Sequence, residues 1–590
     1  MVVAVVPNNK GFTCIFRKEL WWDGALCVPK DLAKVIVFGV AVQFFDASFV
    51  KAKRDRFQSW KIQSRTHSQP HPFSDHGANL SLPWTMHRSI DIRSLLVFRV
   101  GLGLFLCFDV VVRLTPWPYS LAWYTKDGFL EPHDSPHGNV VHRFWFARTD
   151  AVTQIGLFSA TFVLAILFSA GFAVTTRPRL AVALQILLWI LLVAQQHRCM
   201  PVHTGSDNFT RQMLLWYILL PVSVQQKIQG LGSKRYIPVT TSVASMATTG
   251  LLLQITLMYL GTVARRTIDV DLSRSDWLPP NLCALWYILR DAFAVREQWY
   301  VDLLRSLSFQ STQVMTALAM MVESSPLLWL FTPNTSSTTN NRCPSPRWVG
   351  FVLMESLHIG LLVLMRLPNW QTIALLANIL WIPTVSWDRV WPLPDDNAAY
   401  KKTDEADGLE TRNVTQPTEC SREGSVPRRA LTIFFLVYML YNFGGERRWI
   451  PKHDGGDVGE FLRISQFWVM YNRAARQAKV TTVAGWNQEE EWVDVFQGLR
   501  TNRWEWRPKD TLESSKLQYF VAPRWERALH QITTSSDQPR ATRFLQTLCR
   551  YVPSQVQSLE MRWEHYRIKR PDQLGRWNFE YAVPVRIECP

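Results

Sequence analysis

The sequence predicts an all-α polytopic membrane bundle of about nine spans, followed by a small α+β extramembrane domain. Residues 152–174 carry no charged side chain, and at about 1.5 Å per residue they cross a hydrocarbon core of about 30 Å as one helix. A basic turn with Arg177 and Arg179 follows, and then a second apolar run at 180–194. These two runs predict a membrane hairpin. Residues 444–590 are polar instead, with short alternating runs typical of strands.

Composition and charge fit a membrane protein with polar ends. The mean hydropathy of -0.04 averages an apolar middle with basic termini. The formal net charge is +16, and the basic residues lie in the tails and in loops beside apolar runs, as the positive-inside rule and anionic lipid favour. No nucleic-acid-binding motif accompanies this charge. The expected partner is therefore the lipid bilayer and not nucleic acid, and the sequence identifies no protein partner.

The cysteines and the common catalytic motifs exclude several classes of protein. The nine cysteines are scattered singly without a CxxC pair, so we expect no metal site and no thioredoxin-type redox site. Cys549 and Cys589 form a disulfide if the C-terminal domain is lumenal, and are free thiols otherwise. The chain has no Gly-rich phosphate loop, no GxSxG and no HExxH, which argues against nucleotide, serine-hydrolase and zinc-protease chemistry. The sequence identifies no cofactor.

Shifts in composition divide the chain into five regions. The N-terminal region is basic and is expected to be largely disordered, because its one apolar run, 35–45, is too short for a comfortable span. A polar linker without hydrophobic periodicity separates the last span from the others. In order, the regions are the N-terminal extension 1–88, the multi-span domain 89–390, the linker 391–428, the last span 429–443 and the C-terminal domain 444–590.

The spans are predicted from apolar runs, some of them short enough to be tilted or partly re-entrant. Residues 264–310 are Trp-rich and amphipathic, which is typical of segments at the membrane interface, and 332–347 are expected to form a loop. Two alternating runs, 492–496 and 581–587, predict strands. The predicted spans are 94–112, 152–174, 180–194, 209–224, 246–263, 314–331, 348–364, 371–383 and 431–443.

Basic residues in the short loops predict the orientation of the chain. Arg177 and Arg179 lie between the second and third spans, and Lys227, Lys234 and Arg235 lie between the fourth and fifth. Both loops fall on the side of the basic N-terminal extension, which is therefore expected to be cytosolic. About nine spans would place the C-terminal domain on the opposite, lumenal or exterior side. We expect a multi-pass protein of an endomembrane, such as the endoplasmic reticulum, or of the plasma membrane.

Ionisable residues inside predicted spans are costly, and they are therefore candidates for function or for buried structural contacts. Arg99 and Asp109 lie about three turns apart in the first span, so they cannot pair with each other and each needs another partner. Two interpretations remain open for both residues: a buried pair, or a side chain that snorkels to water. Asp109 is followed four residues later by Arg113.

The sixth and seventh spans carry three more candidates. Glu355 and His358 are spaced i,i+3 and share one helix face, and Glu323 lies inside the preceding span. The spacing of Glu355 and His358 can ligate a metal, but such sites need a second copy from another helix, and the sequence contains none. The three groups either line a polar cavity that supports acid–base chemistry or form hydrogen bonds between helices.

The predicted lumenal loop 197–211 gathers further candidates. It contains His203 and Asp207 among several histidines and arginines, a set that can bind an anion or transfer a proton. The alternative is a hydrated loop in which Ser206 or Asp207 caps a helix that begins near Phe209. His203, Asp207, Glu323 and His358 are thus the candidate catalytic residues. Arg99, Asp109 and Glu355 are candidate structural or cavity residues.

Several segments resemble a known membrane family in their order and spacing. The segments are SLLVFRVGLGLFLCFDVVVRL, WYTKDGF, HTGSDNFTRQMLLWYILLP, DWLPPNLCALWYILRDAF, VESSPLLWLFTP, HIGLLVLMRLPNWQTIALLANILWIPTVSWD and AGWNQEEEWVDVFQGL. They resemble the horizontally transferred transmembrane (HTTM) domain, the membrane core shared by vitamin K-dependent gamma-carboxylases and many uncharacterised relatives. The resemblance covers about 90–390 and 430–590 and is closer to the uncharacterised relatives than to the carboxylase.

The resemblance implies a membrane enzyme or a related protein of unknown chemistry. In the carboxylase, a lysine before the fourth span acts as the base on vitamin K hydroquinone, but 199–203 contain no lysine here. Gamma-carboxylation is therefore disfavoured, with His203 the nearest substitute base. Arg99, Asp207, Glu323 and His358 match the wider family pattern without an assigned role. We expect a protein that acts on a lipid-soluble or quinone-like substrate, or else a non-enzymatic transporter or scaffold.

Overall fold

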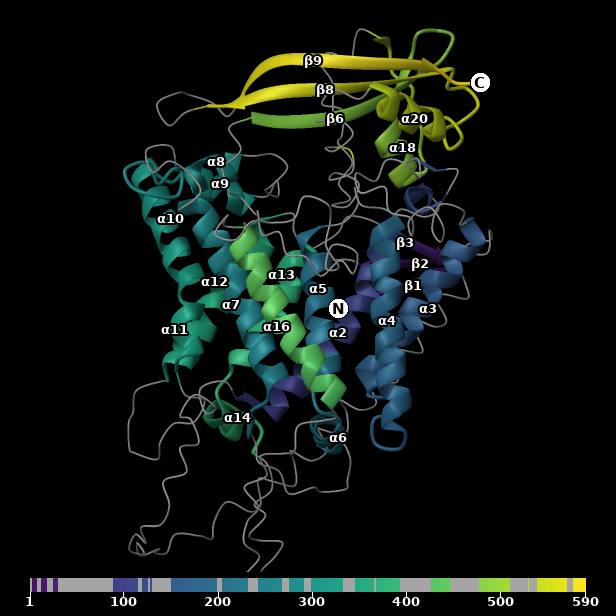
Figure 1. The fold of residues 1–590 in the computed structure, drawn as a ribbon. Helices are drawn as coiled ribbons and strands as arrows, with labels where there is room; N and C mark the ends of the chain where they lie inside the picture. The colour runs from purple at the N-terminus through teal and green to yellow at the C-terminus, as the bar shows by residue number, and fades with distance from the viewer. Residues whose placement is uncertain are drawn as a thin grey trace, which may run out of the picture.

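The structure is a computed structural model of the full chain, and Figure 1 shows its fold. It describes residues 3–7, 12–17, 25–29, 89–114, 119–125, 128–129, 150–198, 204–231, 242–267, 275–290, 299–332, 345–365, 368–392, 426–446, 477–509, 529, 538–569 and 577–590. Several predictions fall outside these ranges: the apolar run 35–45, His203, most of the loop 332–347, and most of the linker 391–428.

A bundle of helices forms the larger part of the described chain. Five of its helices are long and apolar enough to span a membrane, as the sequence predicts. They are α2 (Ile92–Arg113), α3 (Ala151–Ala170), α4 (Pro178–Arg198), α7 (Met246–Thr267) and α12 (Pro346–Leu364).

The four remaining predicted spans correspond to shorter, interrupted or less apolar helices in the same bundle (Figure 1). Pro326 at the start of α11 interrupts the sixth, and the eighth tightens into a 3-10 turn, η7. These elements are α5 (Gly205–Leu219), α10 (Phe309–Ser324) with α11 (Pro326–Leu330), α13 (Pro368–Asn378) with η7 (Ile379–Trp381), and α16 (Val426–Glu446).

The prediction for the fourth span is wrong at both ends. A helix was expected to begin near Phe209 and to reach 224, but α5 begins at Gly205 and ends at Leu219. Pro221 follows, and a separate helix, α6 (Val222–Gly230), continues the chain. Since proline lacks the N–H of a helix interior and disfavours helical backbone in the preceding residue, the break at Leu220 follows from the sequence.

Short polar side chains begin most of the long helices. Asp91 accepts a hydrogen bond from the backbone N–H of Arg93, and Asp150 accepts one from Thr153, each at 2.8 Å. Ser308 and Ser345 cap α10 and α12 in the same way. Such caps satisfy N–H groups that the first helical turn leaves without partners. The end of α3 is also determined by a nearby residue, because Gly171 adopts a left-handed φ of 67° that suits glycine.

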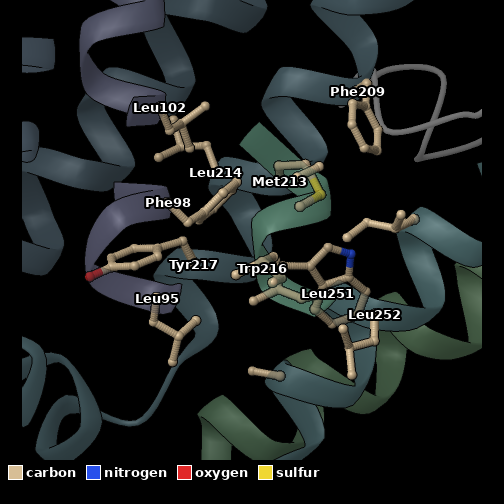
Figure 2. Close-up of a cluster of buried hydrophobic side chains, with 14 of the residues drawn as sticks. Leu95, Phe98, Leu102, Phe209, Met213, Leu214, Trp216, Tyr217, Leu251 and Leu252 are labelled. Atoms are coloured by element: carbon tan, nitrogen blue, oxygen red, sulfur yellow. The ribbon is translucent and has the colours of Figure 1, made fainter. Parts of the chain in front are cut away.

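The main hydrophobic core lies where α2, α5 and α7 meet. Figure 2 shows Phe98 of α2, Met213 of α5 and Leu251 of α7 among the side chains of this cluster. All three are fully buried. The aromatic side chains Phe209, Trp216 and Tyr217 of this 15-residue helix are buried in the same core, and aromatic side chains of this size bury large areas.

Two glycines of α12 give a matched pair of predictions. A Cβ added at Gly350 would lie 1.9 Å from Cε2 of Trp329 in α11, whereas one added at Gly360 would have no atom within 4 Å. We expect Gly350→Ala to lower the free energy of unfolding by about 1–3 kcal/mol through overpacking. Gly360→Ala should raise it by about 0.5–1 kcal/mol, since alanine is the better helix former. Thermal unfolding of the detergent-purified variants measures both, and equal effects would contradict this packing.

A four-stranded antiparallel sheet forms the C-terminal domain, in the strand order β7-β6-β8-β9. Its strands are β6 (Gln477–Trp486), β7 (Trp492–Asp494), β8 (Ser558–Ile568) and β9 (Trp577–Glu588). The strand predicted at 581–587 is confirmed within β9. The one predicted at 492–496 is only half right, because Asp494 caps a helix, α18 (Val495–Thr501), that replaces its second half.

A second hydrophobic core joins this domain to the helical bundle. It contains Val110 of α2 and Phe158 of α3 together with residues of β6, β8 and α20 (Gln538–Leu548). Tyr119 of the short helix η3 (Tyr119–Trp123) packs edge-on against Tyr551 at a ring distance of 5.3 Å. Burial raises the pKa of both phenols. Cys549 and Cys589 form a disulfide in the structure.

Smaller elements complete the described chain. Three antiparallel strands, β1 (Val3–Pro7), β2 (Phe12–Arg17) and β3 (Ala25–Pro29), lie in the N-terminal extension, which was expected to be largely disordered. The Trp-rich segment after α7 forms two short helices at the end of the bundle that faces the sheet (Figure 1). The remaining elements are α8 (Ala284–Arg290), α9 (Trp299–Arg305), α14 (Thr384–Val390), β4 (Ile90–Asp91) and β5 (Ser242–Val243).

Candidate functional site

His358 is the centre of a buried polar network between α7, α12 and α13. Its Nε2 lies 2.6 Å from the hydroxyl of Tyr259, and its Nδ1 lies 2.5 Å from Oε1 of Gln371. Because a carbonyl oxygen only accepts, Nδ1 carries the proton and Nε2 accepts from the Tyr259 hydroxyl. His358 is 2% exposed. The network therefore holds a neutral imidazole in one tautomer, hydrogen-bonded to a phenol.

Glu355 lies one turn before His358 and is incompletely paired. The side chain of Asn378 in α13 lies within interaction range of its carboxyl group. Nevertheless, Glu355 Oε1 and the Asn378 amide nitrogen are both buried without a hydrogen-bond partner among the described residues. Glu355 therefore presents an open acceptor beside the Tyr259–His358 hydrogen bond. Within an apolar helix that is long enough to span a membrane, such a group is costly and marks a candidate site.

Glu323 lies near the same network but forms an ion pair. Its carboxylate binds the guanidinium of Arg266 at the end of α7, and Arg266 in turn lies 3.8 Å from the ring centroid of Trp277. Glu323 and Glu355 are both within electrostatic range of Tyr259. The structure thus brings Glu323, Glu355 and His358 into one region. The charge of Glu323 is balanced there by its ion pair with Arg266.

A second polar cluster lies at the end of α2 that faces the C-terminal sheet. Arg113 binds Asp109 one turn earlier, at 2.8 Å, and also binds Asp207 of α5. Asn369 of α13 donates to the other oxygen of Asp109 at 3.0 Å. Asp109 is 3% exposed, so the interpretation that it snorkels to water is wrong. This cluster joins three helices.

Asp207 has a capping role that differs from the prediction. The N-cap of α5 is Thr204, not Ser206 or Asp207, and Asp207 is the third helical residue of a capping box. Its Oδ2 accepts from the backbone N–H of Thr204 at 2.7 Å. A carboxylate at this position also complements the positive end of the helix dipole. Asp207 therefore fixes the start of α5 and binds Arg113 at the same time.

Arg99 belongs to neither cluster and has no acidic partner among the described residues. It is 3% exposed, and its Nε and Nη1 atoms have no hydrogen-bond acceptor among the described residues. The hydroxyl of Tyr217 lies within electrostatic range of its guanidinium. Neither the ion-paired nor the snorkelling interpretation describes this side chain, which is buried and uncompensated within the described chain.

The neutral members of the first network and Arg266 of the ion pair with Glu323 were not among the residues predicted from the sequence. Tyr259, Gln371 and Asn378 all lie in predicted spans, so a search for hydrogen-bonding as well as ionisable side chains would have included them. Arg266 escaped because it follows the predicted end of its span. Within the described residues, no group of three or more His, Cys, Asp or Glu is placed to hold a metal ion.

The chain was compared with known protein families, with curated proteins and with solved structures, and no match was found.

Proposed function

We propose that this chain is a multi-pass integral membrane protein of the HTTM family with about nine spans. We further propose that Glu355, His358 and Tyr259 form a proton-handling site for a lipid-soluble, quinone-like molecule. The observation that carries this proposal is the open carboxylate oxygen of Glu355 beside the buried Tyr259–His358 hydrogen bond. Five helices of spanning length and composition support the membrane setting.

The chemistry of the three residues suits a hydroxyl-bearing ring. A hydroquinone hydroxyl donates a hydrogen bond, and Glu355 Oε1 is the acceptor without a donor in this region. The fixed tautomer of His358 leaves Nε2 as the basic nitrogen, with the Tyr259 hydroxyl as its proton donor. Such a pair can pass a proton to or from a bound ring without creating a net charge in the bilayer core.

A non-enzymatic scaffold or transporter is the second candidate, and specific contacts favour it. Glu323 pairs with Arg266, and Asp207 pairs with Arg113, as expected for polar groups that hold helices together. A pocket among the described residues is lined by α3, the turn after it and α4, and its lining includes none of the candidate catalytic residues. Gamma-carboxylation stays disfavoured because 199–203 contain no lysine.

Binding of a defined quinone to the purified protein separates the two candidates. Decylubiquinone and its hydroquinol would be titrated into protein in detergent, with tryptophan fluorescence as the readout. We expect the hydroquinol to bind the wild type, and its affinity to be about tenfold or more lower in Glu355→Leu, since leaving a buried hydroxyl without its hydrogen-bond partner costs about 1–3 kcal/mol.

Ser356→Ala is the matched control, because Ser356 is the exposed neighbour on the same helix. It should bind the quinone as the wild type does. Equal affinity in Glu355→Leu and the wild type, together with a higher melting temperature of the variant, would reject the site and favour the scaffold.

The proposed orientation places the N-terminus in the cytosol and the C-terminal domain in the lumen or outside the cell. The basic turn after α3 lies at the end of the bundle away from the C-terminal sheet (Figure 1), in line with the positive-inside rule. The Cys549–Cys589 disulfide supports the same assignment, because disulfides persist in oxidising compartments.

Protease protection tests this orientation. A tag at the C-terminus should resist protease in sealed microsomes and become sensitive once detergent opens them. A tag at the N-terminus should be digested in both conditions, which controls for the protease. Digestion of the C-terminal tag in intact microsomes would reverse the assignment.

A further inference from the structure

The pocket between α3 and α4 lies beside the buried guanidinium of Arg99. Gln185 of α4 is the one polar side chain in its lining. The other lining residues include Leu164, Leu167 and Phe168 of α3, Leu184 of α4 and Gly171 of the turn. A Cβ at Gly171 would lie 2.6 Å from Arg99 Nη1 and 2.0 Å from Gln229 Oε1. Arg99 and Gln229 therefore lie directly against the glycine that forms one wall of the pocket.

The polar atoms at this place are not satisfied by the described protein. Arg99 Nε and Nη1, Gln229 Oε1 and Gln185 Oε1 are all buried without a hydrogen-bond partner in the described residues. A buried guanidinium without an acceptor is strongly unfavourable. Gln185 lines the pocket, and Arg99 Nη1 and Gln229 Oε1 lie directly behind its Gly171 wall. Together these atoms call for a ligand that brings an anion to Arg99 and donors to the two glutamines.

The position of the pocket in the bundle points to the source of the anion. Gly171 ends α3, a helix of spanning length, so Arg99 lies at the level where that helix leaves the apolar layer. The turn adds exposed Arg177 and Arg179, and the pocket wall below is built from leucine and phenylalanine. A phospholipid matches both the basic turn and the apolar wall, because its phosphate oxygens are anionic and its acyl chains are apolar.

We propose that the pocket between α3 and α4 binds a phospholipid with a net negative headgroup, with its phosphate on Arg99 and an acyl chain along α3 and α4. The planar fork of arginine matches two phosphate oxygens at once. Headgroup hydroxyl or ammonium groups donate to Gln229 and Gln185. Anionic lipid is enriched in cytosolic leaflets, which is the side assigned to the α3–α4 turn. The site is independent of the proposed chemistry at His358.

Lipid-dependent stability tests the site in the full-length protein. Protein purified in detergent would be melted with added phosphatidylglycerol, with phosphatidylcholine, and with inorganic phosphate. We expect phosphatidylglycerol to raise the melting temperature at concentrations about tenfold or more below those needed for phosphatidylcholine. Inorganic phosphate should give no comparable rise. If inorganic phosphate raises the melting temperature as much as phosphatidylglycerol does, the ligand is a free anion and the lipid proposal fails.

Substitutions at one position identify Arg99 as the contact. In Arg99→Met the preference for phosphatidylglycerol should disappear, and in Arg99→Lys it should be reduced but present, because lysine keeps the charge and loses the fork. Arg389→Met removes an exposed arginine from α14, which contributes no residue to the pocket lining, and it should keep the full preference. Native mass spectrometry should show a bound phosphatidylglycerol on the wild type. An unchanged preference in both Arg99 variants would overturn the proposal, and Arg99→Lys carries the test alone if Arg99→Met does not fold.

Discussion

Replacing Arg113 by methionine should lower the free energy of unfolding by about 3–5 kcal/mol, or prevent accumulation of the folded protein. The guanidinium of Arg113 binds Asp109 of its own helix and Asp207 of α5, and all three side chains are almost fully buried. Its removal leaves two carboxylates facing each other without the cation. Thermal unfolding in detergent, with yield as a second measure, quantifies the loss.

Two further variants separate this ion cluster from a general effect of losing charge. Arg177→Met removes an exposed arginine and should change stability by less than about 0.5 kcal/mol. Adding Asp207→Asn to Arg113→Met removes one stranded carboxylate and should recover part of the lost stability. Additive losses in the double variant would show that the two residues do not interact.

The long apolar runs of the sequence were enough to predict the five spanning helices of the bundle. A run such as 152–174 predicts a membrane-spanning helix by length and hydropathy alone, and α3 (Ala151–Ala170) covers most of it. The ends of helices were predictable only where proline or a capping residue is decisive. Trp492–Asp494 shows the limit: the alternation continued through Phe496, but the Asp494 side chain accepts from the N–H of Gln497 at 2.9 Å and starts a helix instead.

The sequence shows which polar residues lie in predicted spans, but it does not show which of these residues contact one another. Arg113 and Asp207 are 94 residues apart, and Tyr259 and His358 are 99 apart. Nothing in a single sequence specifies which spans are neighbours, because helix packing depends on shape complementarity over many side chains. The identification of Arg99 as a costly group needed only its type and surroundings. The absence of an acidic partner for it within the described residues emerged only in three dimensions.

The two polar clusters differ in a way that bears on function. In the Arg113 cluster each acidic side chain has a cationic partner, so it fixes helix positions. In the His358 network, the Glu355 oxygen and the Asn378 amide lack partners among the described residues. Structural networks are stable when fully satisfied, and incomplete ones mark places where a ligand or water completes the set. This contrast is why the functional proposal rests on Glu355 and His358.

Phe544→Ala should loosen the contact between the C-terminal domain and the helical bundle at a cost of about 3–5 kcal/mol. Phe544 of α20 is fully buried. Its ring centroid lies 4.8 Å from that of Phe129 and 5.8 Å from that of Trp123. Both partners precede α3 in the chain, so the contact joins the domain to the bundle. Hydrogen exchange of the full-length protein should become faster in α20 and β8.

Trp123→Ala removes the same contact from the bundle side. If Phe544 acts mainly in docking, Trp123→Ala should also speed up exchange in α20 and β8, and the double variant should lose less stability than the sum of the two single losses. Gln546→Ala, an exposed position on the same helix, should leave exchange unchanged. Faster exchange in Phe544→Ala but not in Trp123→Ala would instead place Phe544 in the internal core of the C-terminal domain. The domain would then be held to the bundle by other residues of the second core.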